Sequence, residues 1–158
     1  MKKYLIIPLI LLGVPLCAAA QATGIDTLYD KYSGKEKYTT FEIEGSMLGA
    51  MTDRESSASI NPFEGVEVIK SVVGPAGDET FAAEIRALSE KLGYKRLMSV
   101  NDNETSSTLY YRTVQLKKKT TEFIVVAFGP AENSVICILG NVQPASVAGI
   151  LGGAISKK

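Results

Sequence analysis

Most hydrophobic positions of this chain alternate with polar ones as in strands, and a few segments show helical spacing instead. Between residues 38 and 45, Phe41 and Ile43 alternate with threonine and glutamate, which is typical of a half-exposed strand. A β-branched run from Val66 to Val73 precedes Gly74 and Pro75 and predicts a largely buried strand. Further strands are predicted over residues 94–100, 108–116, 122–128 and 135–140. The pattern therefore predicts a sheet of about five to six strands.

The connectors between the last four predicted strands are short and rich in turn residues. They are Asn101 to Glu104, Lys117 to Lys119, and Gly129 to Asn133. Connectors of this length favour antiparallel pairing of successive strands. The segment from Ile136 to Leu139 is apolar at every position, so both of its faces should be covered. We therefore expect this strand to be central in a mainly antiparallel sheet.

The clearest helical pattern begins at Asp78 and ends at Gly93. Its apolar stripe, which should face the core, comprises Phe81, Ile85, Leu88 and Leu92. A short helix is predicted over residues 24–33, with Ile25, Leu28, Tyr29 and Tyr32 at helical spacing. Ser46 could cap another short helix, which carries Met47, Leu48 and Met51. Pro144 could begin a last helix, whose inward side chains are Val147, Ile150 and Leu151. Residues 52–62 are polar and predict a loop. We expect an α+β fold with the helices packed on one face of the sheet.

The first twenty residues have the layout of an export signal. Lys2 and Lys3 precede an apolar run from Leu5 to Leu16, and the small residues Ala18 to Ala20 follow. This run is shorter than the ~20 residues of a membrane-spanning helix and fits a signal peptide cleaved after Ala20. We therefore expect a single mature domain, residues 21–158, that is periplasmic or secreted. The paired lysines, the brevity of the segment and the absence of a eukaryote-like organisation favour a bacterial source.

Cys17 leaves an alternative open. If this thiol is lipidated, the product is an outer-membrane lipoprotein anchored by its acyl chains. Leu16 speaks against this route, because bacterial lipoprotein signals usually carry Gly, Ala or Ser at that position.

Composition excludes several classes of chemistry. The chain has 17 basic and 17 acidic side chains, which implies no strong attraction to nucleic acid. It has no histidine, so Ser-His-Asp and Cys-His catalysis are excluded, and zinc sites of Cys/His type cannot be built. No phosphate-binding glycine loop is present. We expect no cofactor, no metal site and no enzymatic activity.

Four side chains form the candidate binding surface. Tyr94 and Arg96 share one side of their predicted strand, and Tyr110 and Arg112 share one side of the next. Two pairs of aromatic ring and cation would suit a peptide or glycan ligand. Ordinary cross-strand packing on a half-exposed sheet is the competing interpretation.

Two other features each allow a functional and a simpler structural interpretation. Glu42 and Glu44 lie on one strand face, where they could bind Ca²⁺ or act as the acid and base of a hydrolase, or could be solvated. Cys137 lies mid-strand among apolar residues, where burial should raise its pKa and block access. We expect Glu42 and Glu44 to be solvated and Cys137 to be buried.

The segment from Thr108 to Ile150 also carries a resemblance. Its sequence runs through Leu-Tyr-Tyr-Arg, Thr-Glu-Phe-Ile-Val-Val and Val-Ile-Cys-Ile-Leu-Gly-Asn-Val before an apolar helix. This order resembles the DUF4252 family of small exported Bacteroidetes proteins, whose function is unknown. The resemblance implies an envelope-associated protein and no particular activity. We expect a non-enzymatic binding module with an envelope protein, glycan or peptide partner, and an open sheet edge also allows a homodimer.

Overall fold

The computed structural model describes residues 24–52, 63–115, 119–144 and 146–147. The predicted signal peptide, Cys17, Ile150, Leu151 and nearly all of the predicted loop lie outside these residues. In the described part of the chain, no helix reaches the length and apolarity that crossing a bilayer needs.

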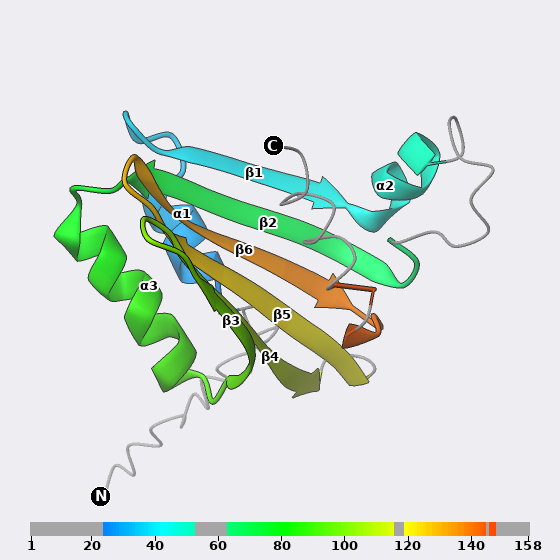
Figure 1. Ribbon diagram of the computed structural model, residues 1–158. Helices are drawn as coiled ribbons and strands as arrows, with labels where there is room; N and C mark the ends of the chain where they lie inside the picture. Colours follow the sequence, from blue (N-terminus) through cyan, green and yellow to red (C-terminus); the bar gives the residue numbers. More distant parts are fainter. Residues whose placement is uncertain (1–23, 53–62, 116–118, 145, 148–158) are drawn as a thin grey trace, which may run out of the picture.

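A single six-stranded sheet forms the centre of the fold (Figure 1). Its strands are β1 (Thr39–Glu44), β2 (Val66–Pro75), β3 (Lys95–Asn101), β4 (Ser106–Gln115), β5 (Lys119–Phe128) and β6 (Glu132–Gly140). They are ordered β1-β2-β6-β5-β4-β3, and every neighbouring pair is antiparallel. The predicted hairpins and the central position of the last strand are confirmed. The sheet-dominated α+β class is therefore confirmed.

Among the described residues, the helices with defined bounds are α1 (Asp26–Tyr32), α2 (Gly45–Thr52) and α3 (Glu79–Lys91). α3 begins as predicted, because the side chain of Asp78 accepts a hydrogen bond from the backbone N–H of Phe81. Helices α1 and α3 pack on the same face of the sheet, where their apolar side chains meet those of β2, β5 and β6. This cluster includes Leu28, Phe81, Ile85, Ile124 and Val135.

Two predictions about the helices are wrong. Leu92 is not part of the core stripe: it caps the C-terminus of α3 and is 37% exposed. The helices also do not share one face, because Leu48 of α2 and the helical residue Val147 belong to a second cluster on the opposite face. The physical reason is that β5 and β6 carry apolar side chains on both sides, including Phe123 and Ile138, so each face needs cover.

Candidate functional site

A buried ion pair lies at the end of the sheet where β4 and β5 extend beyond β3. Glu122, in β5, has no exposed surface. Its partner is Arg112, directly opposite in β4, whose Nε donates a hydrogen bond of 2.6 Å to Oε2 of Glu122. Because a buried carboxylate without a cation is costly, this pair holds both side chains in position.

The second carboxylate oxygen of Glu122 also has partners. Oε1 accepts hydrogen bonds from the backbone N–H of Gly24 at 2.9 Å and from the thiol of Cys137 at 3.4 Å. A Cβ at position 24 would overlap the Tyr94 hydroxyl and the end of the Leu92 side chain, so a larger residue there would have to displace both. The Glu122 carboxylate thus connects the start of α1 to β4 and β6.

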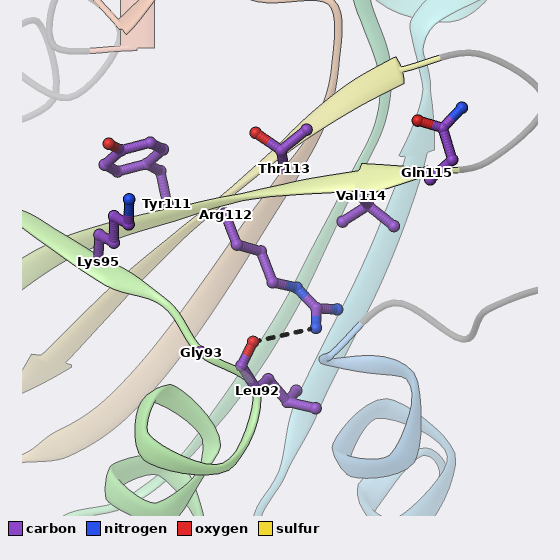
Figure 2. A pocket seen from close by; sticks show the side chains of 8 residues that line it. All are labelled: Leu92, Gly93, Lys95, Tyr111, Arg112, Thr113, Val114 and Gln115. Atoms are coloured by element: carbon purple, nitrogen blue, oxygen red, sulfur yellow. Dashed lines mark hydrogen bonds between the residues drawn. The ribbon is translucent and has the colours of Figure 1, made fainter.

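Arg112 is held on two further sides. Its guanidinium lies 4.8 Å from the centre of the Tyr94 ring, and Nη1 is 3.4 Å from the Leu92 carbonyl oxygen to which it donates (Figure 2). Burial, followed by the nearby Glu122 carboxylate, raises the pKa of Tyr94. The Arg112 side chain keeps 17% of its surface exposed, and that surface faces a pocket.

This basic pocket has a volume of about 800 Å³, within the range of ligand sites. Arg112 and Lys95 line it together with polar groups, and none of the described residues that line it is acidic. Figure 2 shows Arg112 and Val114 on one side of β4 and Tyr111 and Thr113 on the other. The eight lining residues are Leu92, Gly93, Lys95, Tyr111, Arg112, Thr113, Val114 and Gln115. We refer to it below as the basic pocket.

An open strand edge borders the basic pocket. The β3–β4 pairing begins with Lys95 opposite Tyr111, whereas β4 continues to Gln115. Residues 112–115 therefore have β5 on one side, and within the described part of the chain no strand pairs with their other side. Their outward backbone groups are available for hydrogen bonds to an added strand.

The structure separates the four residues predicted to form the binding surface. Arg96 is opposite Tyr110 and is exposed, whereas Tyr110 is half-buried against the α1–α3 core. Arg112 is engaged by Tyr94 and Glu122 as described above. The expected two ring–cation pairs thus become one cross-strand contact, and only Arg112 of the four lines the basic pocket.

The other candidates take ordinary structural positions. Glu42 and Glu44 are exposed, and Glu42 forms an ion pair of 3.4 Å with Lys70. Cys137 is 1% exposed, and burial followed by the Glu122 carboxylate raises its pKa well above the usual value. Among the described residues, no group of three or more acidic or cysteine side chains could hold a metal ion.

Sequence reasoning missed Glu122 and Lys95. A glutamate at the start of a predicted strand looks solvated when the strand is considered alone. The available signal was the hairpin itself, because Arg112 and Glu122 are equally distant from Lys117 at its centre. Antiparallel pairing about that turn places them opposite each other.

Comparison with known proteins identifies the family of this chain. Residues 32–150 match the model of DUF4252, a domain of unknown function. The chain belongs to this family. No curated protein matches it. A crystal structure of PA94, a protein of unknown function from Pseudomonas aeruginosa, aligns with 12% sequence identity over 80% of this chain and 85% of that one, with a TM-score of 0.38.

Proposed function

We propose that this DUF4252 protein is an exported, non-enzymatic binding protein of the bacterial envelope, and that its basic pocket holds an extended acidic segment of a partner protein. The observation that carries the proposal is a pocket that combines Lys95, the partly exposed Arg112 and an unpaired strand edge, with no acidic side chain among the described residues that line it. Export is supported by the layout of residues 1–20.

The proposed binding mode is strand addition. An extended segment gains main-chain hydrogen bonds by pairing with residues 112–115 of β4, and these bonds provide affinity without sequence preference. Selection for acidic side chains then comes from Lys95 and from the exposed part of Arg112. Because Arg112 is already held by Glu122 and Tyr94, its ordering adds little entropic cost on binding.

Site-specific photo-crosslinking in the native envelope tests this proposal. A photoreactive amino acid replaces Thr113, which is exposed and lines the basic pocket, and in a control it replaces Thr39, exposed on β1. We expect one recurrent envelope protein to be captured from position 113 and not from 39, and its crosslinked segment to be acidic. Identical adducts from both positions would contradict the proposal.

A matched pair of charge reversals tests the role of charge. Lys95→Glu should weaken binding of the captured segment roughly tenfold, because it replaces attraction by repulsion at the pocket rim. Lys91→Glu changes net charge equally, and Lys91 does not line the basic pocket. Equal effects of the two variants, measured by titration of a synthetic peptide of the captured segment, would remove the pocket assignment.

Lipidation of Cys17 is the alternative to signal-peptide cleavage after Ala20, and it would change the localisation of the protein. Intact mass of the protein from its native host separates the two routes. A mass that matches residues 21–158 without acyl groups supports signal-peptide cleavage, and a mass that includes acyl chains on Cys17 supports an outer-membrane lipoprotein.

A further inference from the structure

Strand β3 is an exposed edge of unusual composition. All seven of its residues are exposed, although it lies in a sheet whose central strands are buried on both faces. Leu97, Met98 and Val100 keep 43%, 42% and 46% of their surface accessible. They are three of the six large hydrophobic side chains that are exposed among the described residues. An apolar strand with free backbone groups is a template for pairing with another strand.

The charges around β3 indicate which strand pairs with it. Lys95 and Arg96 stand at its first two positions, and Asp102 and Glu104 follow its last residue. If a second β3 runs antiparallel to the first, the basic start of each copy lies beside the acidic end of the other. The apolar residues of both copies then meet in the middle. Such self-complementarity is what a two-fold interface requires.

We propose that two copies of this chain associate through β3, with the two strands antiparallel about a two-fold axis near Met98 and Ser99. The six strands of each copy then continue into one sheet across the interface. Pairing satisfies the free backbone groups of β3 and removes Met98 and Val100 from water. The proposal does not depend on what occupies the basic pocket.

The acidic end is well suited to this role. The carboxylate of Asp102 accepts hydrogen bonds from the backbone N–H groups of Glu104 and Thr105, at 2.9 and 2.7 Å. This turn holds the connector between β3 and β4 and leaves the Glu104 side chain exposed. The Asp102 side chain is needed for the turn, so Glu104 is the residue to change in a test.

Sedimentation of the purified chain measures the association. We expect the wild-type chain to be a dimer. Met98→Asp should be a monomer, because dimerisation of this variant would bury two carboxylates near the two-fold axis. Phe41→Asp is the matched control, because Phe41 is 40% exposed on β1 at the opposite edge of the sheet. The control should remain a dimer. Circular dichroism verifies that both variants are folded.

Charge exchange provides a second test that does not depend on loss of function. Arg96→Glu places acidic groups at both ends of β3, and Glu104→Lys places basic groups there. Each variant alone should dimerise about tenfold more weakly, because the ends of β3 that lie beside each other then carry charges of like sign at positions 96 and 104. An equimolar mixture should recover wild-type affinity as a heterodimer, since each end again meets its opposite charge.

Three results would overturn the proposal. The first is a wild-type chain that stays monomeric at its highest soluble concentration. The second is a dimer that Phe41→Asp disrupts and Met98→Asp does not. The third is a mixture of the two charge variants that associates no more tightly than either variant alone.

Discussion

At the scale of single residues, the Arg112–Glu122 pair governs the structure around the basic pocket. Glu122 is fully buried, so removing its cation leaves an uncompensated charge. We expect Arg112→Met to lower the free energy of unfolding by about 3–5 kcal/mol. The double variant Arg112→Met/Glu122→Gln should lose less, because glutamine is neutral and its oxygen can still accept the Gly24 hydrogen bond.

Urea unfolding of the single and double variants measures this coupling. Lys91→Met is the control, because Lys91 is exposed, lies outside β3, and should change stability by no more than about 0.5 kcal/mol. If Arg112→Met behaved like this control, the ion pair would not be what holds the pocket end of the sheet. The same pair shows why single-strand reasoning fell short: the burial of Glu122 follows from Gly24, Cys137 and Arg112 together, which are far apart in the sequence.

At the scale of elements, the start of α3 depends on Asp78. Its carboxylate accepts hydrogen bonds from the Phe81 backbone N–H and the Tyr38 hydroxyl. The Tyr38 bond, followed by the backbone bond, lowers the pKa of Asp78 below its usual 3.8. A lowered pKa in the folded state means that the unfolded chain binds the proton more tightly. The stabilisation is therefore present above the unfolded-state pKa and is lost as pH falls through the folded-state pKa.

We accordingly expect Asp78→Ala to destabilise the protein at neutral pH and the difference from wild type to shrink as the solution is acidified. Thermal unfolding over a series of pH values measures this. Asp78→Asn is the control, because asparagine can cap the helix but does not titrate over this range. A difference between wild type and Asp78→Ala that is independent of pH would contradict the role of the ionised carboxylate.

Elements with a strong local signal were predicted well from the sequence. The cap at Asp78, the stripe through Phe81 and Ile85, and the short connectors between the last strands all act over a few residues, so their pattern is visible in the chain. Leu92 was misplaced because the periodicity continues one step past Lys91, where α3 ends. Hydrophobic spacing alone does not show where a helix ends.

At the scale of the whole molecule, β6 joins the early and late parts of the chain. It pairs with β2 on one side and β5 on the other. No local signal indicated the β2–β6 pair, because α3 and three strands separate the two in sequence. The second covered face was likewise missed, since β5 and β6 show only that both faces need cover, not which segments provide it.

The central position of β6 makes Cys137 a probe of global unfolding. The thiol is 1% exposed and donates to Glu122, and its raised pKa keeps it protonated. A thiol reagent reacts with the exposed thiolate, so labelling requires that β6 separate from its neighbours. In a Cys17→Ser background, we expect the labelling rate of Cys137 to rise with denaturant in parallel with the population of unfolded chain.

A cysteine introduced at the exposed position Thr113 should label at once under native conditions. If Cys137 labelled as quickly as this control, the sheet would open locally at β6, and the two parts of the chain would not unfold as one cooperative unit.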